Sequence, residues 1–235
     1  MAVVIHAEEQ LHSGAAPRGT AALCTYCSRC KPAPPSYDHC HPMKRLLDVL
    51  ISGVCLALSL PFWIAISVSI LLSDGRPVLY LQRRVGRGGR VFTAYKFRSM
   101  INNAETGTGA VLARKEDPRI TPVGRILRKG ALDEIPQLLN IFKGDMSWVG
   151  PRPERPEFVK QFLGQIPGYA MRHQVSPGLT GVAQVYGRYY TDPVDKLRYD
   201  LYYVRNHSLW LDFRLFVMSW RITIKGRWDS TAARR

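Results

Sequence analysis

An acid pair beside a group of cations is the part of this 235-residue sequence whose residue types could do chemistry. Asp133 and Glu134 are adjacent, Arg128 precedes them and Pro136 follows them. Proline is tolerated only in the first turn of a helix, so Pro136 predicts a helix that begins near Leu132 or Asp133. Both carboxylates then lie at a helix N-terminus, where free N–H groups keep a carboxylate ionised and attract phosphate.

Because the two acids are adjacent in the chain, some reactions that use a pair of carboxylates are favoured and others are disfavoured. Neighbours on a helix point about 100° apart, so the two acids are expected to have different roles. Glycoside hydrolysis is disfavoured because its two carboxylates flank one bond, about 5 Å or more apart. One acid attacking phosphorus, while the other binds a metal or orients the site, fits better, and needs Mg²⁺ with arginine or lysine to neutralise charge. The alternative is a helix cap worth about 1 kcal/mol, which needs neither the second acid nor the cations.

The elements that must position the acid pair are predicted on both sides of it. Downstream, apolar residues at helical spacing continue as far as a stop at Gly144. Upstream, Thr121 is expected to cap a short helix, Pro122 to take its first position and Gly130 to end it. The face of this helix is predicted to comprise Val123, Ile126 and Leu127.

Residues 77–97 are predicted to form a β-hairpin, because strand-forming residues flank the turn Gly86–Gly89. No Gly-Lys-Ser/Thr follows these glycines, which excludes a nucleotide P-loop. The region 151–187 is rich in proline and glycine and is expected to form ordered loops around short helices.

The formal net charge of +15 arises in residues 43–235. It favours a polyanionic partner: nucleic acid, an anionic membrane surface or a phosphorylated substrate. The five cysteines end at Cys55, and this odd, one-sided set argues against a secreted disulfide scaffold. The start of the chain has no secretory signal pattern, so the main domain is expected to be cytosolic.

Residues 49–72 carry no charge over 24 positions, enough for a membrane segment. Pro61 lies near its middle and predicts a kink, and Ser59 could bond a carbonyl that the proline leaves free. Basic residues flank both ends, so the positive-inside rule favours two cytoplasmic ends. A helix that breaks, dips into the bilayer and returns satisfies this rule; a kinked spanning helix is the alternative.

The two ends of the chain differ in character. Residues 1–42 are expected to form a flexible tail; its "CTYCSRC" and the following histidines could instead bind zinc, although the spacing is irregular. Residues 196–220 carry aromatic and basic side chains at helical spacing, which suits either an interfacial amphipathic helix or packing on the core.

Five separated motifs resemble the bacterial sugar transferase family, the monotopic phosphoglycosyl transferases, over residues 43–228. The motifs, in chain order, are "KRLLDVL", "KFRSM", "LRKGALDEIPQLLN", "GDMSWVGPRP" and "SPGLTGVAQVYGR". The resemblance implies a mainly helical α/β domain with a re-entrant membrane helix, a β-hairpin and amphipathic interfacial helices. The expected divisions are a tail (1–42), the membrane helix hairpin (43–75), a cytosolic catalytic domain (76–228) and a C-terminal tail (229–235).

The reaction implied by this resemblance is transfer of a sugar-1-phosphate from a UDP-sugar to undecaprenyl phosphate or another polyprenyl phosphate, with release of UMP. Such enzymes require Mg²⁺ and begin the assembly of exopolysaccharide, O-antigen or other glycans, ahead of downstream glycosyltransferases. The implied location is the cytoplasmic face of the bacterial inner membrane, and no nucleic acid partner is expected.

Site residues follow from the same resemblance, position by position. Asp133 matches the nucleophile, which would carry the phosphosugar covalently, and Glu134 matches its partner; both are also the expected metal ligands. The matches for substrate and phosphate binding are Lys96, Arg128 and Arg152. Ser59 and Pro61 match the break in the membrane helix, although Leu60 separates them where the family commonly has adjacent Ser-Pro.

Two rival functions come from other classes. A basic membrane-anchored binding protein would use the charge excess alone, and its affinity would fall steeply with salt while Asp133 was dispensable. A membrane-tethered hydrolase of nucleotide sugars would yield UMP without a lipid acceptor.

Overall fold

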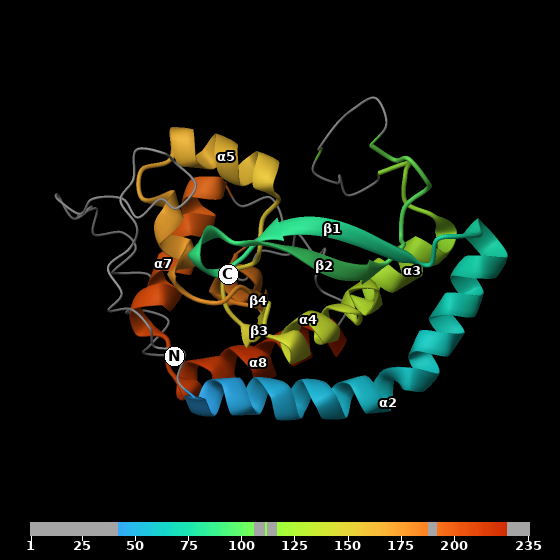
Figure 1. Cartoon of the computed structure of the whole chain (residues 1–235), viewed down its shortest axis with the longest axis horizontal. Coiled ribbons are helices and arrows are strands. Elements are labelled where there is room, and N and C mark those ends of the chain that lie inside the picture. Colours follow the sequence, from blue (N-terminus) through green and yellow to red (C-terminus); the bar gives the residue numbers. More distant parts are fainter. Residues whose placement is uncertain (1–41, 106–110, 112–116, 188–191, 225–235) are drawn as a thin grey trace.

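The computed structural model describes residues 42–105, 111, 117–187 and 192–224. The chain is mainly helical in these ranges and includes a two-stranded antiparallel sheet and a short parallel pair of strands (Figure 1). The predicted class, mainly helical with a hairpin and a long apolar N-terminal helix, is therefore confirmed at this level. The candidate zinc motif of the tail lies outside the described residues.

The apolar segment forms one continuous helix, α2 (Pro42–Asp74), with Pro61 inside it. Figure 1 shows that α2 is bent: its first part runs along the base of the molecule and its second part turns up toward α3 (Pro122–Lys129). A proline removes one helical hydrogen bond and kinks the helix, which accounts for the bend. The predicted kink at Pro61 is thus present (Figure 1), in a helix that stays continuous through the proline.

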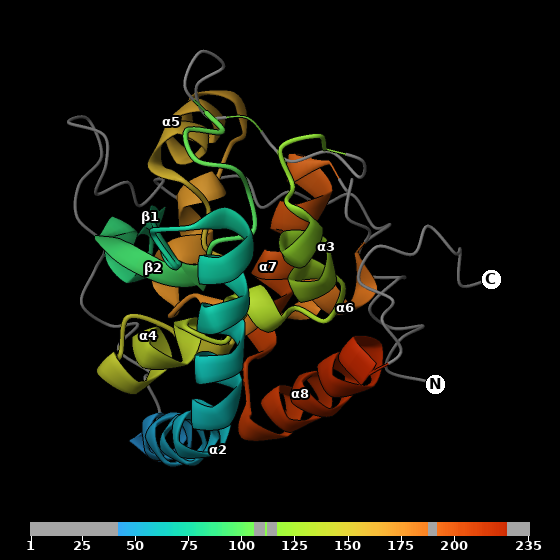
Figure 2. The same ribbon diagram turned by 90° about the vertical axis from the view of Figure 1, so that its right-hand side faces the viewer.

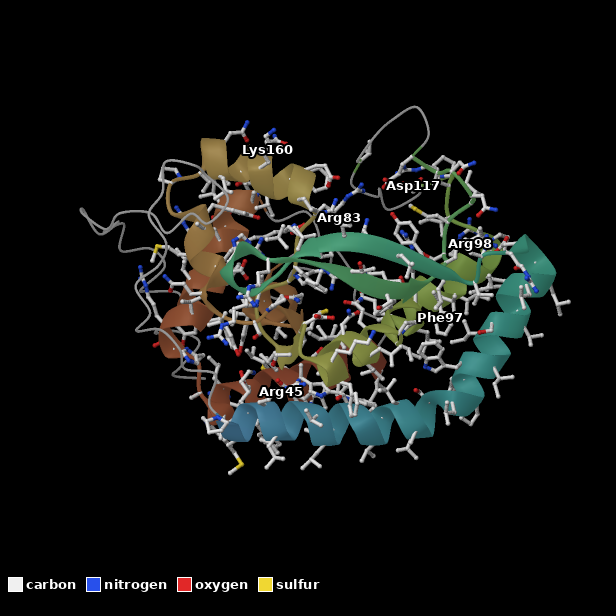
Figure 3. The ribbon with its side chains drawn as sticks, viewed as in Figure 1. Arg45, Arg83, Phe97, Arg98, Asp117 and Lys160 are labelled. Carbon is white, nitrogen blue, oxygen red and sulfur yellow. The ribbon has the colours of Figure 1, made fainter. Side chains whose placement is uncertain are left out.

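Each part of α2 packs against a different group of residues. In the first part, Cys55 and Leu56 lie against Leu138 and Ile141 of α4 (Gln137–Lys143). In the second part, Ile66 and Ile70 are buried with side chains that include Trp63, Phe97 and Leu127. The rings of Trp63 and Phe97 meet edge to face at 5.1 Å, and Figure 3 shows Phe97 between the hairpin and α2.

The hydroxyl of Ser59 is bonded within α2, although not as expected. It donates to the carbonyl of Leu56 at 3.0 Å. The carbonyl that a proline at position 61 leaves without its usual donor belongs to Ala57. The prediction that Ser59 bonds the carbonyl left free by Pro61 is therefore wrong.

The predicted hairpin is confirmed. Strands β1 (Leu79–Val85) and β2 (Val91–Phe97) pair antiparallel, with Tyr80 opposite Lys96. The turn between them is a short 3₁₀ segment, η2 (Arg87–Gly89). Gly88 and Gly89 have φ of 63° and 77°, values that glycine adopts without steric cost.

Helix α3 has the predicted ends. The Thr121 hydroxyl accepts a hydrogen bond from the N–H of Gly124 at 2.9 Å, Pro122 follows at the first position, and Gly130 forms the C-cap. The predicted face is wrong in one residue, because Ile126 is 69% exposed while Leu127 is buried. With eight residues, α3 reaches the core through Val123 and Leu127, which are one turn apart.

The proline- and glycine-rich region contains short elements, as predicted, and one pairing that the sequence did not predict. Strand β3 (Ser147–Val149) runs parallel to β4 (Gly178–Thr180). Between them lie α5 (Pro156–Gln165) and η4 (Tyr169–Gln174), and α6 (Val182–Tyr186) follows β4. A side chain at position 178 would meet the backbone N of Gly150 at 2.1 Å, so these loops approach each other only because glycine is present.

The C-terminal stretch forms two helices, where the sequence predicts one. Helix α7 (Pro193–Asn206) ends before His207, whose ψ of 132° is not helical, and α8 (Leu209–Ile224) then begins. The Ser208 hydroxyl accepts a hydrogen bond from the N–H of Leu211, which satisfies a free donor at the start of α8. Helix α8 both packs on the core and exposes aromatic residues, with Leu215 and Ile222 buried and Trp210 and Phe213 exposed.

Candidate active site

The acid pair lies on a tight turn that leads into α4. Residues Leu132–Glu134 form a 3₁₀ turn, η3, where the sequence predicts the first turn of an α-helix. Pro136 has no N–H and therefore cannot bond the carbonyl of Leu132 in the α-helical pattern. The N–H of Ile135 bonds that carbonyl instead, at 3.2 Å. Gly144, with φ of 99°, ends α4 as predicted.

Glu134 is held by two cations from different parts of the chain. Lys96, on β2, donates to Glu134 Oε1 at 2.6 Å. Arg152, in the loop after β3, donates to both Glu134 oxygens. Burial raises the pKa of the Glu134 carboxyl, but Arg152 and Lys96 outweigh burial and hold that pKa well below its usual range. Glu134 is therefore a firmly ionised, ion-paired carboxylate.

Asp133 has different surroundings although it is the adjacent residue. Its side chain is buried, and no described residue donates a hydrogen bond to its carboxylate. Burial raises the pKa of Asp133; Lys96 lowers it, Glu134 raises it and Arg128 lowers it, and the net pKa is above the usual value. The two acids thus differ in pKa and in whether their oxygens are already bonded to cations, which is consistent with the different roles expected from the sequence.

Arg128 reaches the acid pair from α3. Its Nε donates to the Ser99 hydroxyl at 2.9 Å, and its charge acts on Asp133. Gly124 makes this approach possible, because a side chain there would meet the carbonyl oxygen of Ser99 at 2.0 Å. The structure therefore brings together all five predicted site residues of the catalytic domain: Lys96, Arg128, Asp133, Glu134 and Arg152. Ser59 and Pro61 are on the apolar helix α2 and are not part of this group.

The side chain of Asn140 sets the acid turn against β2, and the sequence analysis did not identify it. Asn140 is fully buried on α4; its Oδ1 accepts from the N–H of Tyr95, and its Nδ2 donates to the carbonyl of Thr93. The side chain thus bonds the strand at two points, which fixes Lys96 on that strand relative to Glu134. An asparagine among apolar positions of a helix was the available signal.

Arg84 is a second residue that the sequence analysis missed. It lies on β1, and its charge acts on both Glu134 and Lys96. Burial lowers the pKa of Arg84 to about 10, with Glu154 opposing that shift. The sequence has two adjacent arginines, Arg83 and Arg84, and strand alternation sends them to opposite faces. Figure 3 shows Arg83 on the outer side of the hairpin, which is covered by neither α3 nor α4.

The donor chemistry of the acid pair is compatible with Mg²⁺. The described residues contain no group of three or more His, Cys, Asp or Glu side chains that could hold a metal alone. Mg²⁺ is commonly bound by one or two carboxylates plus substrate phosphates and waters, so two adjacent carboxylates are sufficient. Asp133 has the more available oxygens, because those of Glu134 already accept from Lys96 and Arg152.

Comparison with known proteins defines the class. The sequence profile of the family described as bacterial sugar transferase matches residues 39–226, and the chain belongs to this family. A UDP-N-acetylgalactosamine-undecaprenyl-phosphate N-acetylgalactosaminephosphotransferase from Aeromonas hydrophila is 45% identical over 187 residues, which is 78% of this chain. A UDP-glucose:undecaprenyl-phosphate glucose-1-phosphate transferase from Klebsiella pneumoniae is 39% identical over 75% of this chain.

These two relatives are considerably longer proteins. The matched part covers 44% of the Aeromonas protein and 39% of the Klebsiella protein. A shorter relative from Bacillus subtilis, named as a putative undecaprenyl-phosphate N-acetylgalactosaminyl 1-phosphate transferase, is 47% identical over 55% of this chain and 72% of its own length. Two of these names contain N-acetylgalactosamine and one contains glucose, whereas undecaprenyl phosphate is common to all three.

Proposed function

We propose that this chain transfers a sugar-1-phosphate from a UDP-sugar to undecaprenyl phosphate, or a similar polyprenyl phosphate, and releases UMP. The observation that carries the proposal is the contrast within the acid pair: a free, buried Asp133 beside a Glu134 that is bonded to Lys96 and Arg152. The relatives' names, which all contain undecaprenyl phosphate, support the choice of acceptor.

In the first step, an oxygen of Asp133 attacks the phosphorus that carries the sugar. A bond forms between the Asp133 carboxylate and this β-phosphorus, and the bond to the oxygen bridging the two phosphorus atoms breaks. UMP leaves with that oxygen, and the sugar phosphate stays on Asp133 as an acyl phosphate. Asp133 suits this role better than Glu134, because its pKa is raised and its oxygens are not engaged by cations.

In the second step, a phosphate oxygen of the lipid attacks the same phosphorus. The bond to Asp133 breaks, the carboxylate is regenerated, and the product is a lipid diphosphate that carries the sugar. Atoms and charge balance without a further reactant. The enzyme therefore works by a ping-pong sequence, in which UMP leaves before the lipid reacts.

Fixed cations neutralise the phosphates in both steps. Arg152 is the more open of the two cations at Glu134, with 40% of its side chain exposed against 16% for Lys96, so its guanidinium is available to a phosphate. Arg128 and Lys96 act on Asp133 from two other directions. Asp133 and Glu134 would hold Mg²⁺ together with donor phosphate oxygens, and the ion would add charge neutralisation at the diphosphate.

The enzyme is proposed to bind to a membrane surface, because apolar side chains cover the outer sides of two neighbouring helices. The first part of α2 and α8 run along the same side of the molecule in Figures 1 and 2. Helix α2 is long and apolar enough to cross a membrane, and only 11% of its most apolar window is buried. Exposed large side chains on these helices include Leu46, Leu50, Val54, Trp210, Phe213 and Trp220.

The corresponding location is the cytoplasmic leaflet of the bacterial inner membrane, where a soluble UDP-sugar and a lipid phosphate meet. Transfer of the first sugar to the lipid begins a glycan, such as an exopolysaccharide or O-antigen, that downstream glycosyltransferases extend. This placement rests on the cations at both ends of α2.

Turnover with defined substrates tests the proposal. Purified membrane-embedded protein is incubated with Mg²⁺, undecaprenyl phosphate and one of UDP-N-acetylgalactosamine, UDP-glucose or UDP-galactose, and UMP and lipid product are measured. The expected result is continuous UMP release that requires the lipid, with at most one UMP per enzyme in its absence. Continuous UMP release without lipid would identify a nucleotide-sugar hydrolase instead.

A further inference from the structure

At two positions, the loop that carries Arg152 has no backbone N–H group that could donate a hydrogen bond. Arg152 lies between Pro151 and Pro153, and proline has no backbone N–H. Both prolines are buried. The backbone of this loop therefore depends on its carbonyl groups for most of its hydrogen bonds.

Four consecutive carbonyls of this loop, from residue 151 to residue 154, each accept a hydrogen bond, and the donors lie on three elements: β1, η4 and β4. Two donors are backbone amides of strands, and the other two are arginine side chains. The bonds run from Gly178 N to Pro151 O (2.9 Å), from Arg172 Nη2 to Arg152 O (2.7 Å), from Arg84 Nη1 to Pro153 O (2.8 Å) and from Val85 N to Glu154 O (2.9 Å).

Both arginines are themselves fixed by neighbouring side chains. Arg172, on η4, is 5% exposed; its Nη2 lies 2.8 Å from Asp200 on α7, and its Nη1 donates to the Tyr169 hydroxyl at 2.6 Å. Arg84 donates to Gln82 through Nε and Nη2. Burying a guanidinium and a carboxylate costs several kcal/mol of desolvation, and a well-packed apolar pair is often at least as stable. The buried pair Arg172–Asp200 therefore does not owe its role to its contribution to stability. Its role is to hold the carbonyl of Arg152, to which Arg172 donates a hydrogen bond.

We propose that Arg172, oriented by Asp200, and Arg84 are positioning residues that fix the backbone of Arg152 so that its guanidinium faces the donor phosphate. The proposal rests on the function proposed above, in which Arg152 binds that phosphate. The Arg152 side chain leaves this fixed backbone and reaches Glu134, so a shift of the loop would move both the phosphate contact and the ion pair. A displacement of about 1 Å at a catalytic group can reduce the rate about 100-fold.

A double-mutant cycle tests whether Arg172 acts through Arg152. Arg172→Lys retains the charge and shortens the reach, so kcat/KM for the UDP-sugar is expected to fall about 10- to 100-fold, while KM for the lipid changes little. The variant Arg152→Lys is expected to lose activity by itself. The double variant should then be no worse than Arg152→Lys within about twofold, because groups that act as one unit are not additive.

Two controls separate positioning from general effects. Arg198→Lys makes the same change on an exposed arginine that pairs with Asp195, and it should leave kcat/KM unchanged. Ile66→Ala destabilises the core cluster around Phe97, which contains no residue of this loop, and it reveals how much activity is lost through instability alone. If Arg172→Lys does not fold, Asp200→Asn and Tyr169→Phe take its place in the cycle, since each removes one of its fixed partners.

Hydrogen exchange gives a readout that does not depend on activity. The amides that report on this loop are those of Val85 and Gly178, which donate to the carbonyls of Glu154 and Pro151. Peptides that contain these two amides should exchange faster in Arg172→Lys than in the unchanged protein, while α4 peptides are unaffected. If no UDP-sugar is turned over, the proposed function fails even where this exchange result holds. Positioning is refuted if folded Arg172→Lys keeps full kcat/KM, if the losses in the double variant multiply, or if exchange at the amides of Val85 and Gly178 does not change.

Discussion

Asp133 and Glu134 are neighbours in the chain, yet the fold gives them opposite electrostatic environments. Glu134 receives donors from Lys96 and Arg152, whereas Asp133 is buried without a donor among the described residues. A carboxylate that is already bonded to two cations is a weak nucleophile, and a desolvated one is stronger. In the proposed mechanism, this difference favours Asp133 for bond formation and Glu134 for electrostatic organisation.

Replacing Asp133 by asparagine is therefore expected to abolish both a covalent adduct and turnover. Incubation of the unchanged protein with a UDP-sugar that it uses, followed by rapid quench and peptide mass analysis, should show a sugar phosphate on the peptide that contains Asp133. In Glu134→Gln the adduct should still form, more slowly by about 100-fold, because the charge that organises Arg152 is lost. Initial-rate plots that intersect, together with no adduct, would instead indicate direct attack by the lipid phosphate.

His173 predicts a pH dependence of stability. Burial, with Arg172 nearby, lowers the pKa of His173 to about 3, below the value of about 6.5 expected in an unfolded chain. Between these pH values the unfolded chain binds a proton that the folded protein does not, so this contribution is complete above pH 6.5 and is lost as the pH falls. At pH 5 the loss from His173 is about 2 kcal/mol of the free energy of unfolding.

The variant His173→Gln isolates the contribution of His173 to the pH dependence. Between pH 7 and pH 5, the free energy of unfolding should decrease by about 2 kcal/mol less in the variant than in the unchanged protein. The comparison is needed because burial, opposed by Arg172, raises the pKa of Asp200 to about 6, which works in the opposite direction. Denaturant titration at the two pH values measures both proteins. Equal pH slopes would mean that His173 is protonated in the folded state.

At the scale of elements, the contact between α3 and the end of β2 depends on Gly124. A side chain there would meet the carbonyl of Ser99 at 2.0 Å, and that contact is backbone rather than a flexible side chain. Gly124→Ala is therefore expected to destabilise the fold by about 2–3 kcal/mol and to displace Arg128 from Asp133. Thermal unfolding and turnover measure the two effects.

Gly164 supplies the matched control for this substitution. It lies inside α5, and a side chain there would meet nothing within 4 Å. Gly164→Ala should therefore stabilise the protein by about 0.5–1 kcal/mol, through lower entropy of the unfolded chain and better helix propensity. If the two variants behave alike, α3 is not in close contact with the backbone at Ser99.

Local sequence signals predicted the elements whose geometry is decided locally. The caps Thr121 and Gly130, the turn at Gly86–Gly89 and the stop at Gly144 depend on the conformational limits of single residues, and each was confirmed. The resemblance to a known family added the five site residues of the catalytic domain. Their convergence around one turn is a matter of geometry that only the structure reports.

Features set by distant contacts could not be read from the sequence. The pairing of β3 with β4 joins strands of three residues each, too short for a pattern, from segments some 30 residues apart. No glycine or proline marks the break at His207 in the sequence. The break arises where α7 and α8 pack on the same core. Asn140 and the pair Arg172–Asp200 have polar side chains whose partners lie far along the chain.

At the scale of the whole molecule, both ends of α2 are attached to the same domain. Near its start, Arg45 donates to the carbonyls of Ile141 and Phe142 at the end of α4, at 2.7 and 2.8 Å. Just after its end, Arg98 donates to the carbonyl of Gly75. A domain that holds both ends of a helix has to lie on one side of the bilayer, so the bent helix is expected to enter and leave by one leaflet.

Cysteine labelling tests this topology. Single cysteines at Met43 and Ser73, in a chain whose natural cysteines are replaced, should both resist a membrane-impermeant reagent added to spheroplasts. Both should react after the membrane is opened, since both positions are exposed in the structure. Labelling of either position in intact spheroplasts would show a spanning helix. Pro61→Ala should straighten α2 and increase such labelling.

The contacts of Lys44 bear on how this protein can be handled in solution. In the first turns of α2, its ammonium group donates to the carbonyl of Val149, to the Tyr203 hydroxyl and to Asp212. The second part of α2 contributes Ile66 and Ile70 to the core around Phe97. A truncated chain that starts after Asp74 would therefore lose an ion pair and part of its interior, and would aggregate rather than give a soluble enzyme. Purification therefore has to keep the apolar helix, and we expect detergent or a polymer belt to be needed to cover its exposed side, because the same helix also completes the core.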